Sequence, residues 1–273
     1  MKKILLLLTV LVLSVSVIGC QKDAVVDNEE DKEIVVGVSF FPMKEILELV
    51  KDDLKEDGYD IKIEEFTDYQ TPNNLLKNNE LDANMIQHDY FLQSFNDAND
   101  AKLVTIQPLY HATFALYSQD LTSIDDIENG TSITMPDDAT NFSRALHLLG
   151  QAGLLTFKDD KTVGLTVEDI DSNPKELVFE DQVPLTSLAQ RYTETGIAVM
   201  YPTYAKSLEL EGEEQRLYVE EQDSVTEGYA ISLVSRDDNK DSEKMKVLKK
   251  HLTSDKVRQF LIDEYSWASS PAF

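Results

Sequence analysis

The stretch "EIVVGVSFFPMKEILELVKDDLKEDGYDIKIEEF", residues 33–66, decides the fold, because it places a strand, a helix and a second strand in succession. Residues 33–39 form an apolar run of the length of a buried strand, and residues 59–66 alternate between polar and apolar side chains. Between them, residues 42–57 carry apolar side chains at helical spacing, and Gly58 ends the predicted helix. Strand–helix–strand order is typical of α/β proteins.

The same alternation continues through the rest of the chain in two rounds. In the first round, helices are predicted to begin near Thr71 and Asp89, among strand segments at 81–86, 101–109 and 113–118. The second round contains predicted strands at 131–136, 176–180, 196–201 and 228–236, and predicted helices at 140–152, 184–194, 203–211, 241–252 and 254–264. Two rounds predict two lobes, each a mostly parallel sheet flanked by helices.

Two crossing segments, near 112–118 and 226–234, are predicted to join the lobes. We expect residues 33–115 and 229–273 to form lobe 1, and residues 116–228 to form lobe 2. The alternation of strands and helices also fits a single continuous sheet, so this alternative stays open.

The N-terminal sequence "MKKILLLLTVLVLSVSVIGCQKD" has a short positive start followed by an apolar run. The run is shorter than a comfortable membrane span and has the flanks of a signal peptide. Gly19 precedes Cys20 in a way that resembles the lipobox of bacterial lipoproteins, where the thiol is acylated and the cysteine becomes the new N-terminus. We predict a lipoprotein signal peptide at 1–19 and lipidation at Cys20; an ordinary secretory signal with an incidental cysteine is the alternative.

The segment after the cysteine is predicted to be a lipid-anchored flexible tether, residues 20–32, because it is charged and lacks aromatic residues. Cys20 is the only cysteine, so no disulfide can form within the chain. The formal net charge is −26. A body this acidic repels nucleic acid and anionic lipid headgroups, so the sequence excludes nucleic acid as a partner and leaves the lipid anchor as the contact with the membrane.

The sequence contains none of the catalytic or nucleotide-binding motifs G-x-S-x-G, H-E-x-x-H, Walker A or G-x-G-x-x-G. The four histidines, His88, His111, His147 and His251, are scattered, and no two of them have the i, i+4 spacing of a helical metal site. The acidic residues are too numerous to mark one acid–base pair. We therefore predict a protein that is not an enzyme and that uses neither a metal nor a cofactor.

A second stretch, "MPDDATNFSRALHLL" at residues 135–149, places Asn141 and Arg144 in the first turn of a predicted helix. A guanidinium is unusual there, because a helix start favours anions. In one interpretation Arg144 is a surface residue that pairs with Asp137 and Asp138, while Thr140 or Asn141 caps the helix. In the other, the helix start, Asn141 and Arg144 together hold an anion from outside the fold.

Aromatic and polar residues follow the predicted strands at the ends where ligands bind in open α/β sheets. They form five groups: Phe40 to Pro42, Phe66 to Gln70, Met85 to His88, Asn141 to Arg144, and Tyr201 to Thr203. Each group alone is more often packing than ligand contact. Together the five groups predict a binding site.

Several motifs resemble those of the NlpA/MetQ lipoproteins, the methionine-binding components of an ATP-driven importer. They are "EFTDY…PN" and "ELDAN…QH" in the first half of the chain, and "SIDDIENGTSITMPDDATNFSRALHLLGQAGLLTFKD" in the second. The resemblance covers the chain from about residue 33. It implies a two-lobed clamp like that of periplasmic binding proteins, which closes on one free amino acid.

The resemblance also implies roles for individual residues. Arg144 and Asn141 match the residues that hold the backbone charges of the amino acid, and Tyr69 and His88 match residues of its side-chain pocket. The full set of predicted ligand-binding residues is Phe66, Tyr69, Met85, Ile86, His88, Asn141, Arg144 and Tyr201.

This chain departs from the family pattern at the side-chain end of the predicted pocket. Met85 and Ile86 stand where the family has an aromatic pair, and Met43 stands where it has a histidine. Tyr201 replaces an asparagine that would bond the ligand. The resemblance therefore implies an amino-acid ligand that is apolar or carries a thioether, with methionine first among the candidates.

We expect a monomeric, lipid-anchored substrate-binding protein on the extracytoplasmic face of the cell membrane. Its expected partners are a free amino acid, a membrane permease and the ATPase subunit of that permease. The alternative is a surface lipoprotein with a role in adhesion or signalling that retains the fold without transport.

Overall fold

The fold is described from a computed structural model, which describes residues 32–210 and 215–273. The predicted signal peptide, Cys20 and the predicted tether lie outside these residues, apart from Lys32. Residues 32–273 form one compact unit. Within the described part of the chain, no helix is both long enough and apolar enough to cross a membrane.

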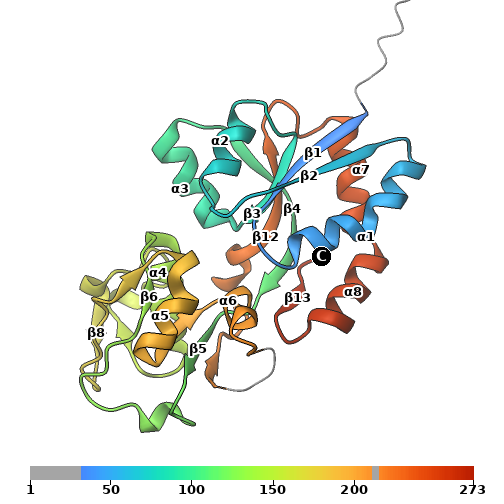
Figure 1. Cartoon of the computed structure of the whole chain (residues 1–273). Helices are drawn as coiled ribbons and strands as arrows, with labels where there is room; N and C mark the ends of the chain where they lie inside the picture. The colour runs from blue at the N-terminus through green and yellow to red at the C-terminus, as the bar shows by residue number, and fades with distance from the viewer. Residues whose placement is uncertain (1–31, 211–214) are drawn as a thin grey trace, which may run out of the picture. The chain divides into compact units, whose positions relative to one another are not determined.

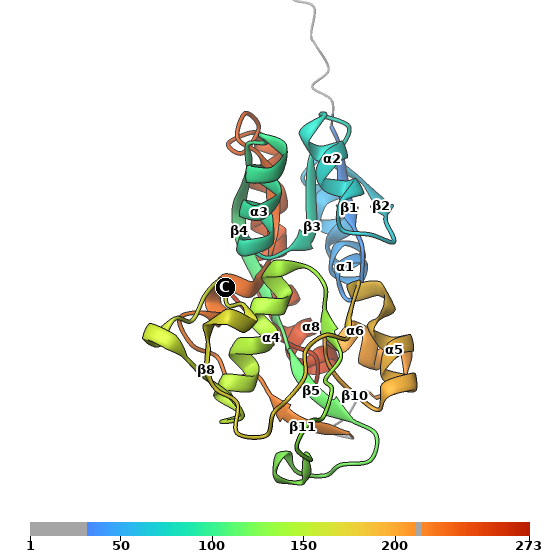
Figure 2. The same cartoon turned by 90° about the vertical axis from the view of Figure 1, so that its left-hand side faces the viewer.

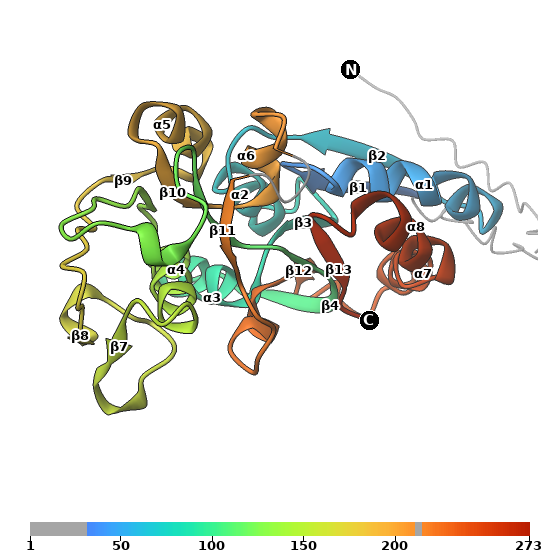
Figure 3. The same ribbon diagram turned by 90° about the horizontal axis from the view of Figure 1, so that it is seen from below.

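The first lobe is built on a six-stranded sheet with the strand order β13-β4-β12-β3-β1-β2 (Figure 1). Its strands are β1 (Glu33–Val38), β2 (Asp60–Glu65), β3 (Ala83–Gln87), β4 (Leu103–Ala112), β12 (Ala230–Arg236) and β13 (Ser269–Pro271). The C-terminus lies beside β13 at one edge of this sheet (Figure 3). The sheet therefore combines strands from both ends of the described chain.

Helices cover both faces of this sheet. They are α1 (Met43–Glu56), α2 (Thr71–Lys77), α3 (Asp89–Asn99), α7 (Glu243–Leu252) and α8 (Asp255–Tyr265). Figure 1 shows α1, α7 and α8 on one side and α2 and α3 on the other. The helical spacing predicted for the opening stretch is confirmed, because Met43, Ile46, Leu47, Val50 and Leu54 are the buried residues of α1.

Strand directions in this sheet are mixed, so the expectation of a mostly parallel sheet is wrong here. β2, β1 and β3 pair in parallel, whereas β12 is antiparallel to both β3 and β4, and β13 is antiparallel to β4. The reason is the path of the chain, which leaves this lobe after β4 and returns as β12. β12 enters the sheet at the end where β4 leaves it, so β12 runs in the direction opposite to β4.

The second lobe contains shorter strands and three helices in the described residues. The strands are β5 (Ala115–Ser118), β6 (Met135–Pro136), β7 (Thr156–Phe157), β8 (Ile170–Ser172), β9 (Gln182–Val183), β10 (Ile197–Met200) and β11 (Arg216–Val219). The helices are α4 (Ala139–Gln151), α5 (Leu188–Thr195) and α6 (Pro202–Ser207). Short 3-10 helices are η1 (Ile124–Asp126), η2 (Lys158–Asp160), η3 (Val167–Asp169), η4 (Leu185–Ser187) and η5 (Thr226–Tyr229).

The strands of the second lobe are also mixed in direction. β5 pairs antiparallel with β10 and β11, while β6 pairs in parallel with β9. α4 and α5 lie on opposite sides of β10 (Figures 2 and 3). The two-lobed α/β class is confirmed, although neither lobe is a mostly parallel sheet.

Separate hydrophobic cores form in the two lobes. One core, which includes Leu146, Leu149 and Val199, belongs to the segment from Phe114 to Leu210. The six-stranded sheet has a core on each face, one with α1, α7 and α8 and one with α2 and α3. The chain crosses between the sheets at 113–114 and at 220–229. The lobe boundaries at 115/116 and 228/229 stay a prediction.

Candidate functional site

A cavity lies between residues of the first lobe and residues of the second. Its walls are formed by Phe40, Phe41, Met43, Tyr69, Ile86, Gln87, His88, Phe91, Tyr110, Ala112, Asn141, Leu185, Tyr201, Thr203 and Ile231. The unfilled space in and around the cavity, open solvent included, is about 470 Å³, and the centre of a water molecule can occupy about 40 Å³ of it. Apolar and aromatic side chains dominate the walls.

Five of the eight predicted ligand-binding residues line this cavity. They are Tyr69, Ile86, His88, Asn141 and Tyr201. The other three, Phe66, Met85 and Arg144, do not line it. Phe66 packs against the core beside α2 and α3, Met85 is buried in the core of the first lobe, and Arg144 is fully buried in α4. Contact of the eight residues with a ligand stays a prediction.

A β-bulge in β3 places Ile86 in the cavity wall. Ser232 of β12 pairs with Gln87 and Val234 pairs with Asn84, so Met85 and Ile86 together oppose a single residue of β12. A bulge of this kind turns one side chain away from strict alternation. It also brings Asn84 and Gln87 together, and their amides are 3.1 Å apart in a buried cluster with Asn73.

Direct contacts between the lobes border the cavity. The hydroxyls of Tyr69 and Tyr204 are 3.0 Å apart, and the Thr203 hydroxyl donates to the carbonyl of Phe41 over 3.1 Å. Burial, followed by the neighbouring hydroxyl of Tyr204, raises the pKa of Tyr69 well above its ordinary value. Burial raises the pKa of Tyr204 as well, so both phenols are neutral at physiological pH.

His88 lies at the start of α3 and caps it. Its Nδ1 accepts the backbone N–H of Phe91 over 3.2 Å, which assigns the ring proton to Nε2. Nε2 lies 3.3 Å from Oδ1 of Asn141, so it donates across to the second lobe. Burial and the charge of Arg144 lower the pKa of His88 to about 3, while the bond to Asn141 opposes this shift. The imidazole is therefore neutral near pH 7.

Asn141 joins several of the predicted residues. Its Oδ1 accepts the hydroxyl of Tyr201 over 2.6 Å, and its Nδ2 donates to both carboxylate oxygens of Asp138. Asp138 is the N-cap of α4, because its side chain accepts the backbone N–H of Asn141 over 3.0 Å. The expectation that Thr140 or Asn141 caps the helix is wrong. Asp138 satisfies the helix start from within the chain.

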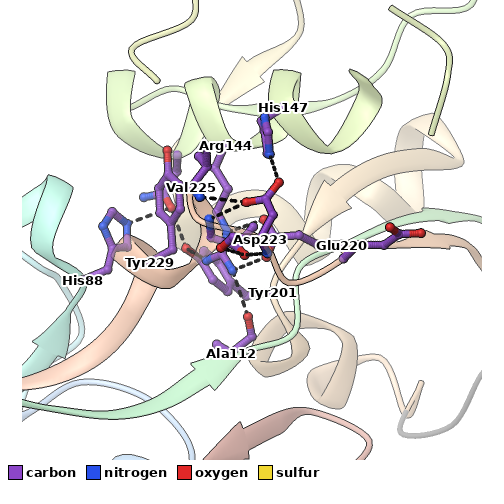
Figure 4. A network of polar contacts seen from close by, with 12 residues as sticks. His88, Ala112, Arg144, His147, Tyr201, Glu220, Asp223, Val225 and Tyr229 are labelled. Atoms are coloured by element: carbon purple, nitrogen blue, oxygen red, sulfur yellow. Dashed lines mark hydrogen bonds and ion pairs between the residues drawn. The ribbon is translucent and has the colours of Figure 1, made fainter. Parts of the chain in front are cut away.

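Arg144 forms a buried ion pair with Glu220, which follows β11 (Figure 4). Its Nε donates to Oε1 of Glu220 over 2.8 Å, and its Nη2 donates to Oε2 over 2.5 Å. Nη1 donates to the hydroxyl of Tyr201 over 2.9 Å, and Nη2 also donates to the carbonyl of Ala112 over 3.1 Å. The interpretation of Arg144 as a surface residue paired with Asp137 and Asp138 is wrong, because its side chain is 0% exposed.

The surroundings of Arg144 are aromatic as well as acidic. The rings of Phe114, Tyr201 and Tyr229 have their centroids 4.9, 5.2 and 4.7 Å from the guanidinium carbon. Burial works to lower the pKa of Arg144, but Glu220 and the Tyr201 hydroxyl outweigh it and raise the pKa. Arg144 is therefore charged and Glu220 supplies its counter-charge. Tyr201, which lines the cavity, is bonded to Arg144, which does not line it.

Sequence reasoning missed Glu220 and several cavity residues. Glu220 stands in the acidic run "VEEQD", where no local pattern distinguishes it from its neighbours. Phe91, Leu185 and Ile231 lie in segments predicted as strands or helices, and no motif marks them. Tyr110 directly follows the strand predicted at 101–109 and is not marked by a motif either. Among residues 32–210 and 215–273, no group of three or more His, Cys, Asp or Glu side chains is placed to hold a metal ion.

Comparisons with known proteins match almost the whole described chain. The family model described as NlpA lipoprotein matches residues 34–273. A methionine-binding lipoprotein MetQ of Bacillus subtilis is 33% identical over 243 residues, which is 88% of both chains. A D-methionine-binding lipoprotein MetQ of Escherichia coli O157:H7 is 31% identical over 246 residues, which is 89% of this chain and 88% of the relative.

Solved structures show the same similarity. A putative methionine-binding lipoprotein of Bacillus subtilis has a TM-score of 0.83 and 32% sequence identity, and the match covers 88% of this chain and 98% of that one. A lipoprotein of Enterococcus faecalis has a TM-score of 0.78 and 34% identity, with coverage of 89% and 100%.

Proposed function

Because the chain belongs to the NlpA lipoprotein family, we propose that it is the substrate-binding component of an ATP-driven amino-acid importer, with methionine first among its ligands. Relatives named as methionine-binding lipoproteins support this proposal. The observation that carries it is the cavity between the two lobes, with aromatic and aliphatic walls and Tyr69, His88, Asn141 and Tyr201 at its border.

The cavity favours an amino acid with an apolar or thioether side chain. Burying the side chain of methionine contributes about 1.5–3 kcal/mol, and aromatic walls add sulfur contacts of about 0.3–1.5 kcal/mol. His88 and Tyr201 are neutral near pH 7, and Glu220 balances the charge of Arg144. Acidic and basic side chains would therefore lose their hydration without gaining an opposite charge.

Binding requires the lobes to part and close again. The contacts Tyr69–Tyr204 and Thr203–Phe41 join the two lobes at the border of the cavity, so they must open before an amino acid can enter between the lobes. Hinged closure around a ligand is a common motion of binding proteins with two lobes. In this proposal the two crossing segments act as the hinge. Asn141 in the cavity wall and Arg144, acting through the Tyr201 hydroxyl, orient the backbone charges of the ligand.

The proposed partners are a membrane permease and its ATPase subunit, to which the protein delivers its ligand. We propose that Cys20 carries the lipid that holds the protein on the extracytoplasmic face of the membrane, in keeping with the lipoproteins among its relatives. The protein acts by binding, not by catalysis, and as a monomer.

Mass spectrometry of small molecules released by denaturing the purified protein tests the proposal directly. We expect methionine or another apolar amino acid in the released fraction. Calorimetry over the common amino acids, including both enantiomers of methionine, then gives the order of affinities. Tight binding of glutamate or lysine, together with no measurable binding of methionine, would contradict the assignment of this cavity to an apolar or thioether amino acid.

A matched pair of variants connects binding to the cavity. Tyr69→Ala removes a half-buried tyrosine from the cavity wall, and we expect affinity for methionine to fall about 10- to 100-fold. Tyr59→Ala removes a half-buried tyrosine that does not line the cavity, and we expect it to leave affinity within twofold of the wild type. Equal effects of the two changes would count against the cavity as the binding site.

A further inference from the structure

The polar side chains that line the cavity differ in whether they have a hydrogen-bond partner within the protein. Gln87 bonds with Asn73 and Asn84, and His88 bonds with Phe91 and Asn141. The remaining partnered side chains in the wall are Tyr69, Asn141, Tyr201 and Thr203, each in a hydrogen bond described above. In this structure each of these groups has a partner within the chain.

Tyr110 is the exception among the described residues of the wall. It lies in β4, is 1% exposed and lines the cavity. Its hydroxyl forms no hydrogen bond with any residue that the structure describes. Because no described residue supplies a partner, this hydroxyl can bond with water or with a ligand.

The hydroxyl of Tyr110 is not sealed inside the protein. The fully enclosed side-chain atoms without a partner in the described residues are His111 Nδ1, Arg216 Nε and Asn239 Oδ1. The hydroxyl oxygen of Tyr110 is not one of them, so it keeps some accessible surface. Tyr110 is almost completely buried and lines the cavity, which points to the cavity as the space that this surface faces.

The phenol of Tyr110 is suited to a ligand with both donors and acceptors. Burial, followed by the nearby charge of Glu45 and the hydroxyl of Tyr201, raises its pKa, so it is neutral near pH 7. A neutral phenol can donate to a carboxylate oxygen or accept from an ammonium group. Arg144, in contrast, already donates to Glu220, Tyr201 and Ala112.

We infer that the hydroxyl of Tyr110 forms a hydrogen bond with a polar atom of the bound amino acid and thereby helps to select the ligand. This inference rests on the proposed function. It assigns to β4 a ligand contact beyond the residues predicted from the sequence. A ligand polar atom that enters this apolar cavity loses its water, and Tyr110 is the wall residue with an uncommitted hydroxyl to replace it.

The test compares Tyr110→Phe with Tyr192→Phe, using free methionine in calorimetry and thermal unfolding without ligand. The Tyr192 hydroxyl donates to Gln215 over 2.5 Å, and Tyr192 does not line the cavity. We expect Tyr110→Phe to weaken methionine binding about three- to tenfold without lowering the unfolding temperature, because no bond within the protein is lost. Tyr192→Phe is expected to lower the unfolding temperature and leave affinity unchanged.

Each outcome decides the inference. Unchanged affinity in Tyr110→Phe, beside a wild type that binds methionine, would overturn the role of Tyr110 and leave the proposed function intact. Weaker binding together with a lower unfolding temperature in Tyr110→Phe would show a structural role and also overturn it. A wild type that binds no amino acid would overturn the proposed function, and this inference with it.

Discussion

The hydroxyls of Tyr69 and Tyr204 meet at 3.0 Å although the two residues are 135 positions apart in the sequence. Tyr69 lines the cavity, whereas Tyr204 does not. The pair therefore joins the wall of the cavity to α6 of the second lobe. A contact of this kind exists only while the lobes are together, so it contributes to the closed form and not to the open one.

Removal of the Tyr204 hydroxyl is expected to weaken ligand binding from outside the cavity. Tyr204→Phe loses one hydrogen bond of the closed form, so we expect affinity for methionine to fall about two- to tenfold. In a Tyr69→Phe background the same change should have no further effect, because the partner is already missing. Calorimetry on the two single variants and the double variant gives this comparison. Independent, additive losses would show that the two hydroxyls do not act as a pair.

The ion pair of Arg144 and Glu220 is expected to show strong coupling in stability. Arg144→Met leaves a buried carboxylate without its partner, and Glu220→Leu leaves a buried guanidinium, so each should lower the free energy of unfolding by about 3–5 kcal/mol. The double variant replaces both charges by apolar groups and should be much closer to the wild type. Urea unfolding of the four proteins measures the coupling. A double variant as unstable as the sum of the single variants would contradict the pairing.

The same ion pair limits what a single substitution at Arg144 can reveal. Affinity lost in Arg144→Met would have two causes that cannot be told apart, the lower stability of the fold and the loss of a contact with the ligand. The double variant Arg144→Met with Glu220→Leu separates these effects if it folds as expected. We expect it to lose affinity for methionine at least tenfold, because no guanidinium then remains behind Tyr201. Wild-type affinity in the folded double variant would remove Arg144 from the binding site.

His88 is expected to make stability depend on pH below neutrality. Its pKa is about 3 in the folded protein, against an ordinary value of 6.5, so between these values the unfolded chain binds a proton that the folded chain does not. Its contribution is fully present above pH 6.5 and is lost as the pH falls, by about 1.4 kcal/mol per pH unit. His88→Asn keeps a side chain that can cap α3 and removes this titration.

The measurement is the free energy of unfolding for the wild type and His88→Asn between pH 7 and pH 4. The difference between the two proteins should shift in favour of the variant as the pH falls. The remaining acidic groups titrate in both proteins and cancel in the difference. Parallel pH profiles would show that His88 is not held neutral in the folded protein.

Cys20→Ala is expected to release the protein from membranes. One acyl chain gives only marginal anchoring, so stable attachment implies two chains on this cysteine. Fractionation of cells that express the wild type, Cys20→Ala and a control with Ser16→Ala in the apolar run compares the membrane-bound shares. We expect only Cys20→Ala to become soluble outside the cytoplasm. A variant that stays on the membrane would contradict lipidation at Cys20.

The regular elements of the first lobe were predictable because their patterns are local. The apolar spacing of residues 42–57 predicted α1, and the run at 33–39 predicted β1. The second lobe was harder, because its strands are short. The segment 176–180 was predicted as a strand but forms one bridge, from Val178 to Ser132. The helix predicted at 203–211 ends at Ser207, and Glu209 has a φ of 61°, which helical backbone does not allow.

The site was predictable only in part, because its decisive contacts join distant positions. Arg144 was singled out because it was predicted in the first turn of a helix, which is wrong, since α4 begins at Ala139 and places Arg144 in its second turn. Its partner Glu220 lies 76 residues away in an acidic run. The bulge that turns Ile86 into the cavity depends on pairing with β12, which local patterns in β3 do not reveal. Likewise, the sequence around Tyr110 does not show that its hydroxyl lacks a partner among the described residues, because this depends on which distant segments pack beside it.

The central position of β12 has a consequence for how the chain assembles. β12 lies between β3 and β4, yet its residues are made only after the whole second lobe has been synthesised. On the ribosome, β1 to β4 therefore emerge before the strand that joins β3 to β4. Until β12 is made, the edges of β3 and β4 that will pair with it have no partner strand. The second lobe can bury its core earlier than the lobe that precedes it in the sequence, and residues 230–273 then complete the first lobe.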